Sequence, residues 1–300
     1  MVFCLFFLRF GITFETDDDW FLMTRIQGVF KQSTPFLIFS NIFYGYALLF
    51  LYKIIPQINW YIAIQLFFLY LAVCQLSIVL LANKRKNDII IILAFLFIIN
   101  LIKEIFFAFQ FTKTASITII AGYAWLYNGV SHEKSIKYTL WGVVTLCFGA
   151  LVRFDCLFLV IPAIGLIIIY DFFVIHECGK RKKKLLCRKV SLLFFTTLLC
   201  SFLPFCEKLY VWHHDKYAEF MSYNGERAKF NDYPHLSYNE NKVFFESHGI
   251  SENDFLMLER RNDIDGFYTK ELISIINSVS YPKKNFKIIF QSLSDFFSAF

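Results

Sequence analysis

Long apolar stretches separated by short polar segments fill most of the chain, and this pattern is typical of proteins that cross a membrane several times. A helix needs about 20 mostly apolar residues to span a bilayer, within a usual range of roughly 17–25. The first stretch is short and the last is interrupted by the C-terminus, so we expect a fragment of a longer protein or the product of a shortened gene. Candidate spans are found at 2–14, 60–82, 89–109, 115–130, 138–151, 156–174 and 190–206, with a further one beginning near 286.

The composition agrees with a membrane protein. Hydrophobic residues make up 57% of the chain and charged residues 18%, with a mean hydropathy of +0.51, which is not the profile of a soluble globular domain. The net charge of +6 could suggest a nucleic-acid binder. Most of the basic excess, however, lies in short loops between apolar runs, where it determines topology, so we expect no nucleic-acid partner.

The distribution of Lys and Arg predicts how the chain is oriented. The loops at 83–87, 131–137 and 176–189 carry three, two and seven basic residues, whereas the turns at 110–115 and 152–156 carry one each. Because cytoplasmic loops of membrane proteins are enriched in Lys and Arg, we expect the three basic loops inside and the two turns outside.

One apolar segment, 36–53, does not fit this alternation as a spanning helix. If it crossed the membrane, the predicted side of every later loop would be reversed. We therefore predict that 2–14 crosses outward and that 36–53 lies along or dips into the outer interface. This arrangement places Asp17, Asp18 and Asp19 outside the cell, directly above the membrane.

The predicted fold is all-α, a polytopic transmembrane bundle of about seven crossings with one interfacial helix and a small extracytoplasmic helical lobe. In the lobe, Ser251 is followed three residues later by Asp254, which resembles the capping box that starts a helix. The predicted domains are a transmembrane domain (1–206, with a first outer loop at 15–59), the lobe (207–285) and the start of a further transmembrane helix (286–300).

The densest acidic cluster of the chain is formed by Asp17, Asp18 and Asp19. It could be a solvated loop, but adjacent carboxylates repel one another unless a cation, a donor or water relieves them. Such a carboxylate can accept a proton from a hydroxyl, or help to hold a divalent cation beside phosphates. Both roles suit chemistry on a lipid-linked phosphosugar, so we predict the three aspartates as catalytic candidates.

A second pair of charges, Arg153 and Asp155, interrupts the long apolar stretch 138–173 at a predicted outer turn. The pair could serve only to separate two spans. Alternatively, Arg153 binds a phosphate, because guanidinium groups match phosphate oxygens, and Asp155 orients the arginine.

A third pair, Lys103 and Glu104, lies in the outer half of the predicted span 89–109. Ionisable groups within a membrane are costly and tend to face a cavity or one another. Lys103 could instead extend towards the outer interface, whereas Glu104 could support the site as an additional acid.

A fourth cluster, "VWHHDK", contains Trp212 and His213 just beyond the span 190–206. Adjacent histidines point apart in regular structure, and no third ligand has a suitable spacing, so we do not expect a metal site here. An interfacial polar cluster is the better interpretation, in which a sugar could stack on Trp212. The eight cysteines show no metal-type spacing either and are interpreted as small apolar fillers.

An acidic pair after the first apolar run, an interfacial segment, many further spans and an outer lobe together resemble the GT-C superfamily of membrane glycosyltransferases. The stretches "DDDWFLMTRIQG" and "SNIFYGYALLFLYKIIPQINWY" are similar to a group of bacterial membrane proteins from Firmicutes that are related to the GtrII-type glucosyltransferases. The lobe stretches "DYPHLSY" and "HGISENDFLML" are similar to the same group.

The resemblance implies a hexosyltransferase in the plasma membrane, with its site facing outside. It would move a sugar from a polyprenyl-phosphate donor to a cell-surface glycan or lipid. The acidic pair of the family corresponds to Asp18 and Asp19, and Arg153 resembles the basic residue that holds the donor phosphate. The turn at 110–115 lacks the second acidic residue of many GT-C enzymes. The alternative is a transporter or a non-catalytic component of polysaccharide assembly and export, which would place charges along a path through the bilayer midplane.

Overall fold

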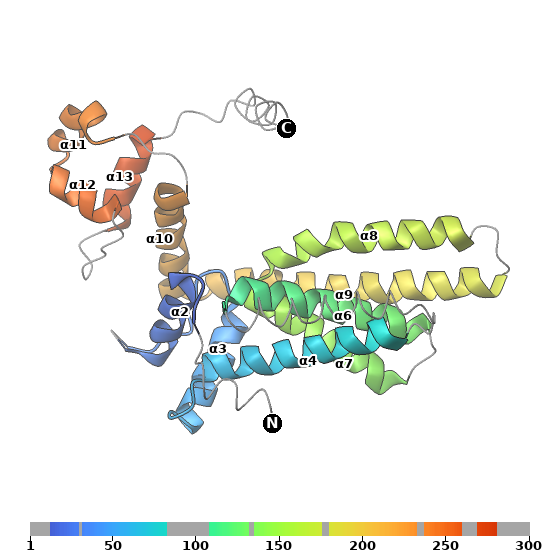
Figure 1. Cartoon of the computed structure of the whole chain (residues 1–300). Coiled ribbons are helices and arrows are strands. Elements are labelled where there is room, and N and C mark those ends of the chain that lie inside the picture. Colours follow the sequence, from blue (N-terminus) through green and yellow to red (C-terminus); the bar gives the residue numbers. More distant parts are fainter. Residues whose placement is uncertain are drawn as a thin grey trace. The chain divides into compact units, whose positions relative to one another are not determined.

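The structure is a computed structural model, and almost all the residues that it describes are helical or lie in short connecting loops (Figure 1). Within this part of the chain, extended pairing is limited to one isolated bridge between Phe14 and Phe109. The prediction of an all-α fold is confirmed. The predicted spans at 2–14 and 89–109, and the apolar run from 286, lie almost entirely outside the described residues. The described residues are 13–29, 32–82, 108–131, 135–175, 180–232, 237–259 and 269–280.

The chain divides into two compact units, residues 1–210 and 211–300, close to the boundary predicted at 206. The first unit contains α2 (Asp17–Gln27), α3 (Ile42–Ile54), α4 (Trp60–Ala82), α6 (Phe111–Ser131), α7 (Ile136–Val152), α8 (Asp155–Ile175) and nearly all of α9 (Lys180–Trp212). The second unit contains α10 (Asp215–Asp232), the 3-10 turn η1 (Asn239–Asn241), α11 (Lys242–Ser247), α12 (Glu252–Glu259) and α13 (Lys270–Ser280).

The first unit is built around α6, which packs against α4, α7 and α8. Small residues allow α6 and α7 to approach closely, as is usual between helices in membranes. A Cβ atom added at Gly122 of α6 would lie 2.7 Å from the Cβ of Leu146, and one added at Gly149 of α7 would lie 2.5 Å from Oγ1 of Thr118. The two glycines are therefore required by the packing of this helix pair.

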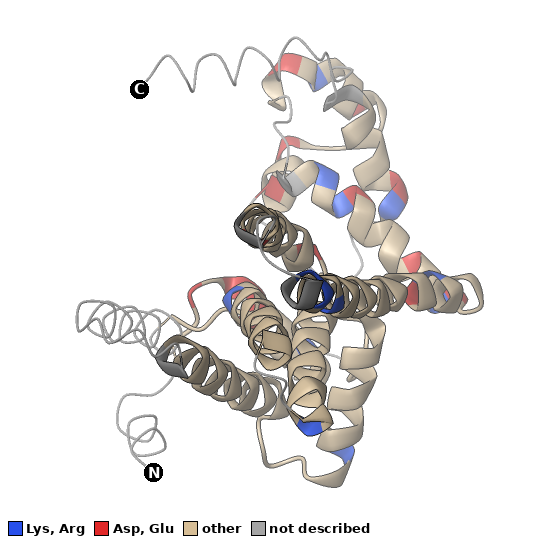
Figure 2. Cartoon of the chain, turned by 90° about the vertical axis from the view of Figure 1, so that its right-hand side faces the viewer, with Lys and Arg blue, Asp and Glu red and all other residues tan. Residues whose placement is uncertain are grey.

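Among the described residues, three helical segments are long and apolar enough to cross a membrane: Trp60–Leu80, Asp155–Phe173 and Lys183–Trp212. In Figure 2 most of the ribbon of the first unit is tan, the colour of residues other than Lys, Arg, Asp and Glu. The other two predicted spans in this part of the chain form α6, which is less apolar, and α7, which has only 17 residues. By length and composition these three segments could each span a membrane, and the number and direction of crossings stay predictions.

The predicted interfacial segment 36–53 is only partly helical, because α3 begins at Ile42. The side chain of Asn41 accepts a hydrogen bond from the backbone N–H of Phe43 at 3.1 Å, which caps the helix at this point. Before this cap, Phe39 has a positive φ of 69°, which is incompatible with a continuing helix. The apolar pattern of 36–53 does not show this turn, which divides the segment into a non-helical part and α3.

The second unit has a hydrophobic core of its own. The predicted capping box is confirmed: the N–H of Asp254 donates to Oγ of Ser251 at 3.2 Å, and the N–H of Ser251 donates to the Asp254 carboxylate at 2.9 Å. The buried core residues are Phe230, Tyr238, Phe245, Ile250, Phe255, Leu258, Ile273 and Ile276.

Candidate functional site

Three segments that the sequence placed outside the cell meet at one end of the first unit. They are α2 with its aspartates, the start of α6 in the turn 110–115, and the connection between α7 and α8 in the turn 152–156. Asp19 accepts a hydrogen bond from the backbone N–H of Phe111 at 3.1 Å, and Arg153 donates to the Thr112 hydroxyl at 2.7 Å. These contacts bring the three segments together, whereas the side of the membrane on which they lie stays a prediction.

The three aspartates have different environments because they lie in the first turn of α2. The buried face of this helix contains Asp19, Leu22 and Ile26, which recur at the three- and four-residue spacing of one helix face. Asp17 and Asp18 lie outside this face and are exposed. Of the three predicted catalytic aspartates, only Asp17 and Asp18 can therefore reach a ligand directly.

The Asp19 carboxylate is completely buried and connects three helices. It accepts hydrogen bonds from the Tyr61 hydroxyl of α4 at 2.8 Å and from the N–H of Phe111, the first residue of α6. A carboxylate at a helix N-terminus is favoured by the partial positive charge there. Desolvation nevertheless outweighs these hydrogen bonds and raises the pKa of Asp19 to about 6. Asp19 is thus an anchor for α2 and not an accessible base.

Arg153 ends α7 and is half-buried at the same end of the unit. Its guanidinium donates to the Thr112 hydroxyl, and its Cζ lies 5.0 Å from the ring centre of Phe39 and 5.3 Å from that of Phe111. Within the described part of the chain it has no ion pair with a carboxylate. The expectation that Asp155 orients Arg153 is not met, because the exposed Asp155 begins α8 and forms no ion pair with Arg153.

A further ion pair stands beside this site, between Lys113 of α6 and Glu15 at 2.6 Å. Its position follows from the bridge between Phe14 and Phe109, in which the N–H of Glu15 donates to the carbonyl of Phe109 at 3.0 Å. The bridge places the residue after Phe14 next to the start of α6. The cation of Lys113 is therefore already neutralised, in contrast to that of Arg153.

Sequence reasoning missed Glu15, Tyr61 and Thr112. Glu15 and Thr112 are close in sequence to the predicted motifs, but nothing in the sequence shows that their segments pair. Tyr61 follows Trp60 at the start of an apolar run, where an aromatic residue is usually an interfacial anchor. Tyr61 is instead completely buried, and its hydroxyl donates a hydrogen bond that holds Asp19.

The remaining predicted site residues lie outside the described part of the first unit. Lys103 and Glu104 lie outside the described residues. Trp212, the last residue of α9, and His213 belong to the second unit, and the Trp212 side chain is 84% exposed. The part of the chain that the structure describes contains no group of three or more His, Cys, Asp or Glu residues able to hold a metal ion.

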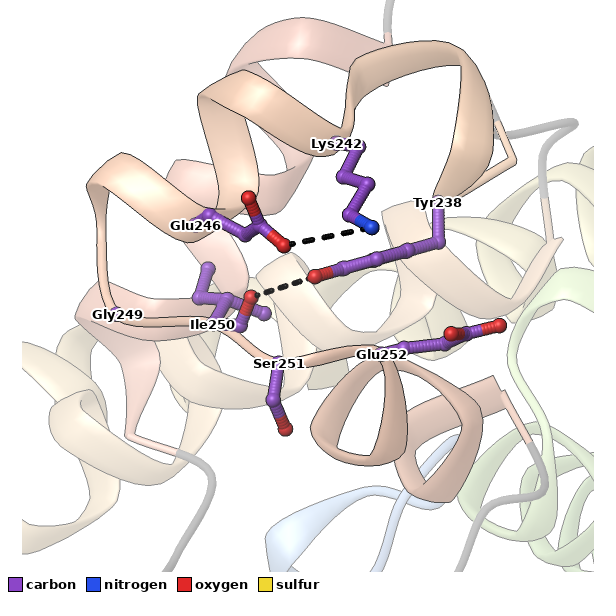
Figure 3. A pocket seen from close by; sticks show the side chains of 7 residues that line it. All are labelled: Tyr238, Lys242, Glu246, Gly249, Ile250, Ser251 and Glu252. Atoms are coloured by element: carbon purple, nitrogen blue, oxygen red, sulfur yellow. Dashed lines mark hydrogen bonds and ion pairs between the residues drawn. The ribbon is translucent and has the colours of Figure 1, made fainter.

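A pocket with a volume of about 310 Å³ lies in the second unit (Figure 3). The hydroxyls of Tyr238 and Ser251 are engaged within the lobe, by the Ile250 carbonyl and by the helix cap. Lys242 and Glu246 form a loose pair at 3.7 Å between exposed side chains, and Glu252 adds a second carboxylate. One cation and two anions do not favour a phosphate, so this pocket suits a ligand that offers hydroxyl donors. The lining residues are Tyr238, Lys242, Glu246, Gly249, Ile250, Ser251 and Glu252.

Comparison of the chain with protein-family models, with curated proteins and with solved structures finds no match.

Proposed function

We propose that the chain is an integral-membrane glycosyltransferase that moves a sugar from a polyprenyl-phosphate donor to a cell-surface glycan or lipid. The observation that carries this proposal is the environment of the Arg153 guanidinium. It is half-buried and held by Thr112 and two aromatic rings, yet no carboxylate of the described residues neutralises it. An arginine in such a setting is suited to bind a phosphate, because its remaining N–H donors match phosphate oxygens.

The proposed reaction divides the roles between neighbouring residues. The exposed carboxylate of Asp18 takes the proton of an acceptor hydroxyl, and the acceptor oxygen attacks the anomeric carbon with inversion. The bond between this carbon and the phosphate oxygen breaks, and Arg153 stabilises the negative charge that develops on the leaving lipid phosphate. Asp19 contributes by fixing α2 against α4 and α6, which keeps Asp18 at the same end of the unit as Arg153.

The transporter alternative predicts charges near the middle of the spanning helices. Among the described residues, the apolar segments contain a largely buried ion pair between Lys189 of α9 and Asp171 of α8, at 3.0 Å. Asp171 lies only two residues before the end of the apolar segment Asp155–Phe173, so the pair is close to one end of the span. The pair therefore does not provide the mid-span charge that a transport path predicts.

The proposal is tested with the full chain in detergent or nanodiscs, supplied with polyprenyl-phosphate-linked radiolabelled glucose and a lipid extract as acceptor. Release of polyprenyl phosphate and transfer of label are measured together. We expect Asp18→Asn and Arg153→Met each to lose transfer by at least about 100-fold, the lower end of the contributions of general acid–base catalysis and of electrostatic stabilisation, respectively. Glu219→Gln, which removes an exposed acid of the lobe, serves as the control.

Asp17→Asn tests whether the effect of Asp18→Asn comes from the loss of the proposed base or only from the loss of a negative charge near the site. It removes the same charge one residue away from Asp18. We expect it to reduce transfer much less than Asp18→Asn. Full activity of Asp18→Asn or of Arg153→Met would exclude the mechanism. If the wild-type chain consumes no lipid-linked donor with any of the common hexoses, the proposed function itself is wrong.

A further inference from the structure

Phe39 has a backbone conformation that a bulky residue rarely adopts. Its φ of 69° lies in the left-handed region, and it is the one non-glycine residue with a positive φ among those that the structure describes. In this region the Cβ atom is too close to the carbonyl oxygen that follows, which is why glycine is usually found there. Such a conformation persists only where the surroundings enforce it, and it is concentrated at functional sites.

The residues after Phe39 are fixed to the end of α7. The Ser40 hydroxyl donates to the carbonyl of Val152 at 2.8 Å, and the N–H of Asn41 donates to the carbonyl of Leu151 at 2.9 Å. These carbonyls belong to the last turn of α7 and have no partner within that helix. The segment that carries Phe39 is therefore fixed directly beside Arg153, the residue that follows α7.

The Phe39 side chain is 43% exposed despite this conformation. Its ring lies 6.1 Å from that of Phe111, at an angle of 19°, and the Cζ atom of Arg153 lies close to both rings. Burial of the ring is incomplete, so hydrophobic stabilisation alone does not explain why the strained conformation is kept. The contact with Arg153 gives it a role.

We propose that Phe39 is a positioning residue that holds the Arg153 guanidinium ready for the phosphate of the lipid-linked donor. An aromatic face stabilises a cation without accepting its N–H groups as a carboxylate would. Phe39 and Phe111 thus orient the guanidinium while leaving most of its donors for a ligand, and Thr112 occupies one. This inference rests on the proposed function, because it takes the phosphate of the donor as the ligand of Arg153.

The test measures binding of a short polyprenyl phosphate to the full chain in nanodiscs, with the corresponding polyprenol as the ligand that lacks phosphate. Phe39→Leu keeps an apolar side chain but removes the aromatic face, and we expect about fivefold weaker binding of the phosphate, as for loss of one cation–π contact. Phe39→Tyr restores the face and should bind as the wild type does. Binding of the polyprenol should not change in either variant.

Phe39→Gly distinguishes positioning from a structural role, because glycine adopts a positive φ without strain. We expect this variant to bind the phosphate more weakly while its melting temperature stays the same or rises. Phe43→Leu is the matched control, since Phe43 of α3 is 44% exposed and the same replacement there removes no contact with Arg153. Both its binding and its melting temperature should equal those of the wild type.

Unchanged phosphate binding by Phe39→Leu would overturn the inference, as would a parallel loss of binding and melting temperature in Phe39→Gly. The proposed function fails in a different way. In that case the wild-type chain does not prefer the polyprenyl phosphate to the polyprenol, or Arg153→Met binds both as the wild type does.

Discussion

Replacement of Asp19 by asparagine gives the sharpest test of the buried anchor at the candidate site. Burial raises the pKa of Asp19 from 3.8 to about 6. Because one pKa unit equals about 1.36 kcal/mol, this shift corresponds to about 3 kcal/mol of folding free energy. The folded pKa is the higher one, so the folded state binds the proton more tightly than the unfolded state. The contribution of Asp19 to stability is therefore fully present below pH 3.8 and is lost as the pH rises through about 6.

Asp19→Asn removes this titration while keeping most of the geometry. One carboxylate oxygen accepts both from the Tyr61 hydroxyl at 2.8 Å and from the N–H of Phe111 at 3.1 Å, and an amide oxygen can take its place. We expect the stability of the wild type relative to this variant to fall by up to about 3 kcal/mol between pH 4 and pH 7. Asp19→Ala should instead be destabilised at every pH, by about 1–3 kcal/mol for each buried donor that it leaves without an acceptor.

The measurement is the free energy of unfolding in mixed detergent micelles, from pH 4 to pH 7.5, for the wild type and both variants. Asp18→Asn is the matched control, because it removes the neighbouring exposed charge and should keep a pH slope close to that of the wild type. If Asp19→Asn keeps the wild-type slope, Asp19 does not titrate in this window and its environment is not the buried one described above. If Asp18→Asn removes the slope, the wrong aspartate has been identified as the anchor.

Two further predictions concern the packing of the first unit. Gly149→Ala should lower the free energy of unfolding by about 1–3 kcal/mol, because its Cβ would lie 2.5 Å from Oγ1 of Thr118. In Gly165→Ala of α8 the added Cβ meets nothing within 4 Å, so this variant should be as stable as the wild type or more stable. Thermal unfolding compares the two variants. Lys189→Met should lower the free energy of unfolding by about 3–5 kcal/mol, because it leaves the Asp171 carboxylate without its ion pair. The double variant Lys189→Met with Asp171→Leu should recover much of this stability in the same assay. Equal stability of the members of either pair would contradict the packing on which it is based.

Sequence reasoning could predict which segments share one end of the bundle. The basic loops predict that the turns at 110–115 and 152–156 lie on the same side, and in the structure the contacts of Asp19 with Phe111 and of Arg153 with Thr112 bring these segments together. The uneven distribution of Lys and Arg is a property of the whole chain, so it can be read without knowledge of side-chain packing.

The division of roles among the aspartates could not be predicted in this way. Asp17, Asp18 and Asp19 are chemically identical neighbours, and only the direction of α2 decides which of them is buried. The partners of Arg153 depend on the left-handed turn at Phe39 and on contacts across more than 40 residues of sequence. Hydrophobic periodicity contains no information about either feature, because it reports which face of an element is apolar and not which loop covers it.

The first turn of α6 explains why the candidate site is formed at this place. Its first three residues each hold one group from another segment: the N–H of Phe111 binds Asp19, the Thr112 hydroxyl binds Arg153, and Lys113 pairs with Glu15. Consecutive residues of a helix are related by a fixed rise of about 1.5 Å, so this turn fixes the distance between the aspartate-bearing helix and the arginine more firmly than a loop would. Because the buried Asp19 fixes α2 against α4 and α6, the neighbouring Asp18 is exposed and yet has a fixed position relative to these helices. The roles proposed for Asp18 and Arg153 therefore depend on Asp19 and on the first turn of α6, which hold their segments together.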